Sequence, residues 1–159
     1  MARETNTFLA IPASQVFTCR WNLKMSPARN HHRNNGKREK PLIFVVDDEP
    51  MLLELASVIL QPLGYALKTF RDPDSAVQSF AAADPHPALI ITDYAMHTMN
   101  GMDLITECRR LKPHQKIILV SGTVSQDVYR HSLTKPDLFL AKPYHPKQLV
   151  DAIETVLSR

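Results

Sequence analysis

Four charged side chains stand at the ends of short apolar runs, and they are the residues best able to do chemistry: Asp47, Asp48, Asp93 and Lys142. Carboxylates brought together repel each other strongly unless a cation lies among them. Mg²⁺ is the natural candidate, since it prefers a few carboxylates together with water and phosphate oxygens. If the apolar runs are strands of one sheet, these side chains could bind Mg²⁺ and a phosphoryl group at one place.

Asp93 is the candidate nucleophile of this set. Ser121, which follows another apolar run, would add a hydroxyl donor, and Lys142 would add a compact positive charge. A phosphoryl group on Asp93 would then have its oxygens bound by metal, ammonium and hydroxyl, the environment that phosphoryl transfer needs. Taken singly, each residue has an ordinary structural explanation, such as a helix cap, a turn or a solvated lysine. Their coincidence at four strand ends favours the functional interpretation.

Five short segments, of which the second is less apolar than the others, supply the strands that would position these residues: 42–46, 66–70, 88–92, 117–120 and 138–141. Five helical segments alternate with them, of which the fourth is a shorter, more polar helix over 126–133. Such alternation is typical of an α/β domain with a central parallel sheet. Because crossovers in parallel sheets are nearly always right-handed, the carboxyl ends of all five strands should lie along one edge, where ligands bind.

Apolar residues at helical spacing predict which helix faces are buried. The first helix begins at Pro50 and is predicted to face the core with Leu52, Leu55, Ala56 and Ile59. The helix after Gly101 is predicted to face it with Leu104, Ile105, Cys108 and Leu111.

The composition suits one soluble domain in a reducing compartment. With 159 residues, 44% of them hydrophobic, the chain can bury a core without disulfides. Its two cysteines, Cys19 and Cys108, lack metal-ligand spacing, so both are expected to be reduced thiols, which favours the cytoplasm. No run approaches the roughly 18 apolar residues that a membrane span needs.

The net charge of +3 divides unevenly along the chain. Residues 1–40 carry eight basic and two acidic residues, a formal charge of +6, whereas the remainder carries eleven and fourteen, a charge of −3. The first 40 residues also lack periodicity, so they are predicted to be a basic, disordered tail before a domain over 41–159. The tail could touch nucleic acid or acidic lipid, but a solvated tail without a specific partner is the simpler interpretation. Met25 is an alternative start.

The order and spacing of four segments carry a family resemblance: VVDDEP (45–50), DYAMHTMNG (93–101), SGT (121–123) and FLAKP (139–143). With these segments, residues 41–159 resemble the receiver domain of two-component response regulators from end to end. The resemblance implies a flavodoxin-like (βα)5 three-layer sandwich with strand order 2-1-3-4-5. It also implies phosphorylation of Asp93 by a sensor histidine kinase or a histidine phosphotransfer protein.

The same resemblance implies roles for individual residues. Mg²⁺ would be bound directly by Asp48, Asp93 and the backbone carbonyl of Ala95, and through water by Asp47. Lys142 would bind the phosphoryl group, with a cis bond to Pro143. Ser121 would move toward the phosphoryl group while the aromatic Phe139 turns inward, so that phosphorylation shifts the population between two packings.

One departure from the family pattern lies in the loop after Asp93. Receiver domains commonly have proline four residues after the phosphorylated aspartate, where this chain has His97. The loop is therefore expected to be less rigid, and His97 could titrate near the site. An exposed loop histidine without a role is the simpler interpretation.

The expected function is a stand-alone signalling switch in the bacterial cytoplasm, not an enzyme. It would act as a monomer or phosphorylation-dependent dimer and contact a protein target through the 126–133 helix, the fifth strand and the last helix, without binding DNA or membrane. One rival is a receiver fold that serves as a binding module without being phosphorylated. Another is a haloacid-dehalogenase-like phosphatase, but its Asp-x-Asp-x-Thr motif is missing at both Asp47 and Asp93.

Overall fold

The structure, a computed structural model, describes residues 41–159, and the predicted disordered tail of residues 1–40 lies outside the described residues. The strands are β1 (Leu42–Val46), β2 (Ala66–Phe70), β3 (Leu89–Asp93), β4 (Ile117–Ser121) and β5 (Leu138–Ala141). The α-helices are α1 (Pro50–Leu60), α2 (Pro73–Ala81), α3 (Gly101–Leu111) and α4 (Pro146–Leu157).

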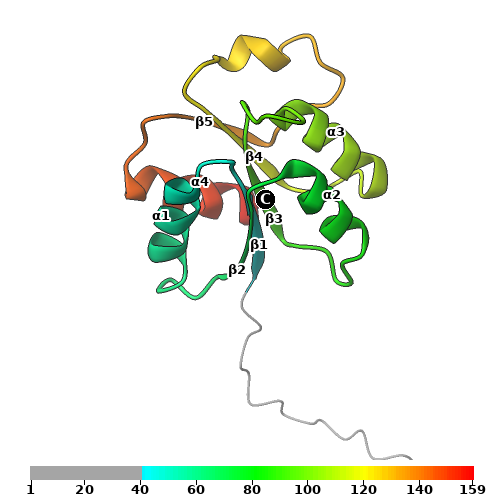
Figure 1. Ribbon diagram of the computed structural model, residues 1–159. Helices are drawn as coiled ribbons and strands as arrows, with labels where there is room; N and C mark the ends of the chain where they lie inside the picture. Colours follow the sequence, from blue (N-terminus) through cyan, green and yellow to red (C-terminus); the bar gives the residue numbers. More distant parts are fainter. Residues whose placement is uncertain (1–40) are drawn as a thin grey trace, which may run out of the picture. The chain divides into compact units, whose positions relative to one another are not determined.

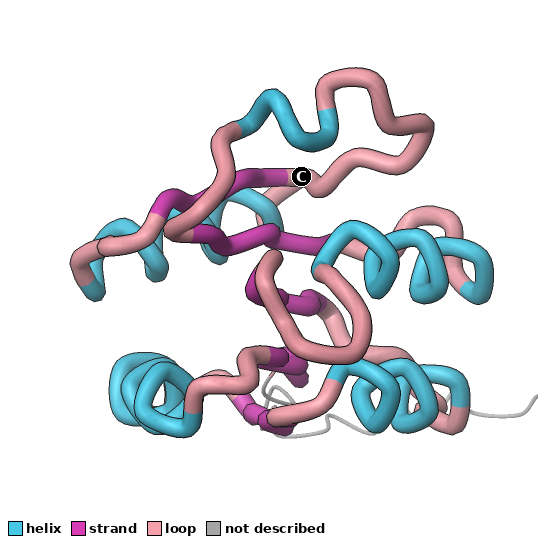
Figure 2. Tube along the Cα trace, turned by 45° about the horizontal axis from the view of Figure 1, so that its top comes forward, coloured by secondary structure: helices cyan, strands magenta, loops and turns pink. Residues whose placement is uncertain are grey.

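All five strands pair in parallel in the order β2-β1-β3-β4-β5, which confirms the predicted topology. Helices cover both faces of the sheet, with α1 and α4 on one side and α2 and α3 on the other (Figures 1 and 2). Each face has its own apolar core: Leu53 and Ile153 belong to one, Phe80 and Leu104 to the other. The central strand β3 is buried along its whole length, as its unbroken apolar sequence predicts.

The first helix turns to the core a face that only partly matches the one predicted: Ala56 is buried and Ile59 packs against the core, as predicted. Its buried residues are Leu53, Ala56 and Leu60, whereas Leu55 is 42% exposed. The helix is apolar nearly all round, so its sequence contains more than one stripe at helical spacing and does not identify the buried one. Leu111 of α3 was also predicted to face inward and is 40% exposed.

The predicted helix over 126–133 is wrong. The β4–β5 connection contains one short 3-10 helix, η1 (Gln126–Tyr129), with no buried residue. Short helices in proteins depend on an apolar face packed against the core. Here Leu133 is fully exposed and Val128 is exposed too, so this segment has almost nothing to anchor a longer helix.

Candidate functional site

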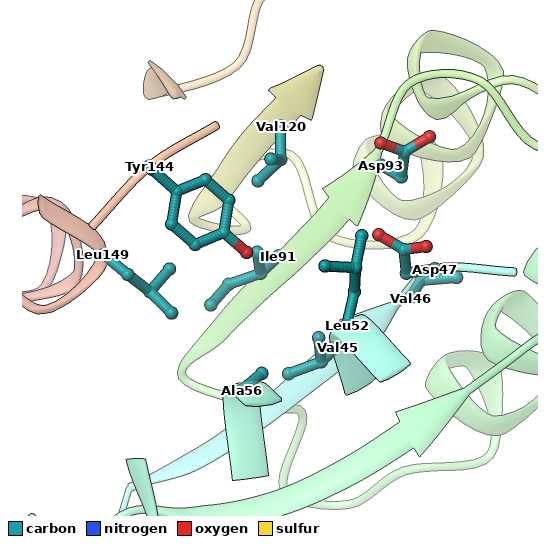
Figure 3. A pocket seen from close by; sticks show the side chains of 10 residues that line it. All are labelled: Val45, Val46, Asp47, Leu52, Ala56, Ile91, Asp93, Val120, Tyr144 and Leu149. Carbon is teal, nitrogen blue, oxygen red and sulfur yellow. The ribbon is translucent and has the colours of Figure 1, made fainter. Parts of the chain in front are cut away.

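The carboxyl ends of the strands gather the predicted charged residues at one edge of the sheet. Asp93 is the last residue of β3, one position later than predicted for the strand, and pairs in register with Val120 of β4. The strand extends to Asp93 because the ladder continues there, with Tyr94 donating its amide N–H to the Val120 carbonyl at 2.8 Å. Figure 3 shows Asp47 and Asp93 beside each other at the ends of their strands.

Lys142 lies between these two carboxylates. Its ammonium donates to Asp47 Oδ2 at 2.8 Å and to Asp93 Oδ1 at 2.6 Å. Asp47 and Asp93 are both only 7% exposed, and about a fifth of the Lys142 side chain is exposed. Two buried carboxylates thus share one cation, which offsets part of their mutual repulsion.

Burial and charge act in opposite directions on these groups. Burial raises the pKa of Asp93 above its ordinary range and outweighs the lowering by Lys142. For Lys142, burial lowers the pKa, but the hydrogen bonds to Asp47 and Asp93 outweigh it and the net shift is upward. The lysine is therefore held as a cation facing the candidate nucleophile.

Backbone amides fix the remaining oxygens of the two carboxylates. The N–H of Glu49 donates to Asp47 Oδ1 at 2.9 Å, and the N–H of Ala95 donates to Asp93 Oδ2 at 2.7 Å. Each carboxylate is therefore oriented on one side by the loop that follows it and on the other by Lys142. Such an arrangement holds a nucleophile in place before a reaction begins.

Glycine lets α3 begin directly against the site. A Cβ on Gly101 would lie 2.3 Å from the Asp93 carbonyl oxygen and 2.7 Å from Leu119 Cδ1. The Gly101 N–H donates to the Tyr94 carbonyl at 2.9 Å, and Asn100 caps the helix by accepting from the amides of Met102 and Asp103. The helix start is thereby fixed to the end of β3.

The two predicted switch residues lie at β4 and β5. Ser121 is buried, and its hydroxyl accepts from the amides of Thr123 and Val124 at 3.1 and 3.2 Å, so it faces its own loop. Among residues 41–159 the Ser121 hydroxyl makes no hydrogen bond to Asp93 or Lys142. The Ser121 backbone carbonyl accepts from the Lys142 amide at 2.7 Å. Phe139 is half-buried, with its ring centroid 6.2 Å from that of Tyr129.

Asp48 and His97 form a contact that the sequence interpretation missed. Nδ1 of His97 lies against Asp48 Oδ2, which joins the loop after β1 to the loop after β3. The His97 side chain is 90% exposed, as expected, whereas that of Asp48 is 26% exposed. A histidine in the loop that follows the candidate nucleophile was a signal for this contact, but the partner could not be read from the sequence.

Tyr144 is a second site residue that sequence reasoning missed. It lines a cavity of about 10 Å³ together with Asp47, Asp93 and apolar residues such as Leu52 and Ile91. In Figure 3 its hydroxyl is directed toward Ile91. Burial raises the pKa of Tyr144, with Lys142 opposing that shift. Its place directly after Lys142-Pro143 was the available signal.

The donor chemistry at this edge fits Mg²⁺. Asp47, Asp48 and Asp93 offer hard carboxylate oxygens, and the Ala95 backbone lies next to Asp93. Within residues 41–159, no three His, Cys, Asp or Glu side chains form a ready-made metal cluster. Mg²⁺ does not need one, because it usually takes one or two carboxylates and fills its shell with water and phosphate oxygens. The predicted cis bond between Lys142 and Pro143 is present.

Comparison with known proteins points the same way. The family model "Response regulator receiver domain" matches residues 43–154. The DNA-binding response regulator MtrA of Mycolicibacterium smegmatis is 29% identical over 74% of this chain and 50% of its own length. PhoB of Escherichia coli, a phosphate regulon transcriptional regulatory protein, is 31% identical over 74% of this chain and 52% of its own. The chain thus spans about half the length of these relatives.

Solved structures also resemble this fold. The response regulator protein TrrA of Thermotoga maritima, in complex with Mg(2+)-BeF, is 29% identical with a TM-score of 0.64, covering 73% of this chain and 98% of that one. A CheY-like receiver domain protein of Methanospirillum hungatei is 24% identical with a TM-score of 0.69, covering 75% and 94%. Within the part of the chain that the structure describes, no helix is long and apolar enough to span a membrane.

Proposed function

Because the chain belongs to the response regulator receiver family, whose members are signalling domains, we propose that it is the phosphoacceptor switch of a two-component phosphorelay. The phosphoryl group would come from a histidine kinase or a histidine phosphotransfer protein and be carried by Asp93. One observation carries this proposal. Asp93 is a buried carboxylate at the end of the central strand, with one oxygen held by Lys142 and the other by the Ala95 amide.

The proposed reaction is a phosphoryl transfer between two side chains. An Asp93 oxygen attacks the phosphorus, forming an acyl phosphate, while the P–N bond to the donor imidazole breaks and its electron pair returns to that ring. The Lys142 ammonium already contacts Asp93 and would bind the phosphoryl oxygens as negative charge develops on them. The Asp47 carboxylate, which shares Lys142, would keep that ammonium aimed at the acceptor.

The proposed Mg²⁺ ligands are Asp48 and Asp93, the Ala95 carbonyl, and Asp47 through water. When bound, Mg²⁺ would neutralise charge on the transferring phosphoryl group. The all-oxygen donor set supports this assignment, as does the partial exposure of Asp48, which leaves its carboxylate accessible from solvent.

Ser121 and Phe139 are the proposed switch residues. The Ser121 hydroxyl would leave the amides of Thr123 and Val124 and donate to a phosphoryl oxygen on Asp93. Phe139, now half-buried against Tyr129, would turn inward behind it. The surface that changes would comprise the β4–β5 segment, β5 and α4, and we propose it as the contact site for a downstream protein.

Intact-mass measurement after incubation with acetyl phosphate tests the proposal, with and without Mg²⁺. Wild type should gain one phosphoryl group only with Mg²⁺, and Asp93→Asn, which keeps size but removes the nucleophilic charge, should gain none. Asp103→Asn, which changes an aspartate on α3, is the matched control and should behave like wild type. No gain by folded wild type, even from a histidine phosphotransfer donor, would instead support the unphosphorylated binding module.

A further inference from the structure

His97 brings an imidazole to the edge of the proposed metal site. Its Nδ1 contacts Oδ2 of Asp48, and within residues 41–159 the Asp48 side chain makes no other hydrogen bond or ion pair. Lys142, by contrast, forms ion pairs with Asp47 and Asp93. The proposed site therefore divides into a lysine-bound half and a half in which carboxylate and imidazole face each other.

Carboxylate and imidazole are both metal ligands, but they suit different metals. Mg²⁺ prefers oxygen donors, whereas imidazole nitrogen suits Co²⁺, Ni²⁺, Zn²⁺ and other transition metals. Two ligand atoms of one such ion, each about 2.1 Å from it, lie on the order of 3 Å apart. Nδ1 of His97 and Oδ2 of Asp48 are already in contact, so a small outward movement would let one ion bind both.

His97 is also free to make that movement. Its ring is 90% exposed, so little packing fixes its orientation. In the neutral tautomer with its proton on Nε2, the Nδ1 lone pair can face a metal. The flanking Met96 and Thr98 lie in the same β3–α3 loop, which holds no helix or strand of its own.

We propose that His97 is a metal ligand beside Asp48, and that it biases the site at Asp93 toward a divalent transition metal relative to Mg²⁺. The inference rests on the proposed metal site. It changes the chemical class of the ion that the site prefers, from one bound by oxygen alone to one that also accepts nitrogen.

Calorimetric titration with Mg²⁺ and with Co²⁺ tests the inference, using wild type, His97→Ala and His97→Gln. Gln can still donate a hydrogen bond to Asp48 but lacks the imidazole nitrogen. Both variants should lose about tenfold or more in Co²⁺ affinity while Mg²⁺ affinity stays within about twofold or rises. His114→Ala, an exposed histidine between α3 and β4, is the matched control and should keep both affinities.

Pulsed EPR of the Mn²⁺-bound protein provides a direct readout of the bond. Wild type and His114→Ala should show coupling of the metal to an imidazole ¹⁴N, and His97→Ala should lack it. An unchanged ratio of Co²⁺ to Mg²⁺ affinity in His97→Ala overturns the inference, as does undiminished Co²⁺ affinity in His97→Gln. If Mg²⁺ binding still depends on Asp48, the proposed function survives that result, whereas binding of neither ion overturns the metal site itself.

Discussion

The two connections on either side of β4 are built very differently. The β3–β4 connection contains α3, an 11-residue helix with an asparagine cap and four buried residues. The β4–β5 connection comprises the 16 residues 122–137. Its only helix is the four-residue η1, in which no residue is buried. Both begin at the same edge of the sheet, so the difference comes from their sequences and not from the topology.

The difference follows from where apolar residues fall. Helix α3 is anchored along its length by apolar residues at helical spacing that pack against strands β3 and β4: Leu104, Ile105 and Cys108. The β4–β5 segment exposes Leu133 completely and Val128 substantially. Segments with few buried contacts open at low free energy, and moving elements are drawn from them.

This contrast suits the proposed function. Asp93, which must stay in place, ends the strand that leads into α3, and Gly101 packs against its backbone. The proposed switch residues, Ser121 and Phe139, lie at the two ends of the loosely packed connection. A charge change at Asp93 should therefore be felt in the β4–β5 segment far more than in α3.

Thiol reactivity should separate the two connections most strongly. Burial, with a smaller effect of Glu107, raises the pKa of Cys108 to about 12 from an ordinary 9.0. At pH 8 the thiolate fraction of Cys108 should be about a thousandfold lower than that of an ordinary cysteine. This fraction should rise about tenfold per pH unit until the pH approaches 12. The measurement is the rate of reaction with a disulfide reagent in Cys19→Ser, where Cys108 is the remaining thiol.

Leu133→Cys in a Cys19→Ser, Cys108→Ser background is the comparison, because position 133 is fully exposed. Similar rates at positions 108 and 133 would mean that α3 opens as readily as the β4–β5 segment, and the contrast would be lost.

Truncation of one leucine in each connection should give the second largest difference, measured as loss of unfolding free energy. Leu104→Ala removes a fully buried side chain and should cost about 2–5 kcal/mol of unfolding free energy. Leu133→Ala removes a fully exposed one and should stay within about 0.5 kcal/mol of wild type. Urea denaturation measures both, and a loss above that range for Leu133→Ala would show that the segment packs in a way the contrast denies.

Substitution of one glycine in each connection should give the smallest difference in unfolding free energy. Gly101→Ala would put its Cβ 2.3 Å from the Asp93 carbonyl, and relief of that clash should cost about 1–3 kcal/mol. Gly122→Ala meets Lys142 Cβ at 3.3 Å, which a shift of a few tenths of an ångström relieves. In the same urea titration, Gly122→Ala should therefore lose less unfolding free energy than Gly101→Ala. A larger loss for Gly122→Ala would mean that the start of the β4–β5 connection is packed more rigidly than the start of α3, against the contrast between the two connections.

The sequence predicts the sheet well because most of the strands are short apolar runs bounded by turn residues; β2, which contains Lys68 and Thr69, is the least apolar. All five strands fall within one residue of their predicted bounds. The alternation with helices predicts that the sheet is parallel, whereas the strand order was implied by the family resemblance. The charged residues at the strand ends follow from that register, since parallel strands share their carboxyl edge.

Three features could not be read from sequence, each for a physical reason. The buried face of α1 is ambiguous because apolar residues surround that helix. The helix predicted over 126–133 fails because tertiary packing, absent there, decides whether a short helix forms. The contact of His97 with Asp48 joins loops 49 residues apart, and no local pattern specifies it.

Hydrogen exchange followed by mass spectrometry tests the central claim most directly, which is that phosphorylation of Asp93 acts on the β4–β5 connection and leaves α3 in place. The protein is compared with and without acetyl phosphate and Mg²⁺, with Asp93→Asn as control. The prediction is slower exchange over 122–137, unchanged exchange over 101–111, and no change in the variant. Equal changes in both connections, no change in a protein shown to carry the phosphoryl group, or the same response in Asp93→Asn would contradict it.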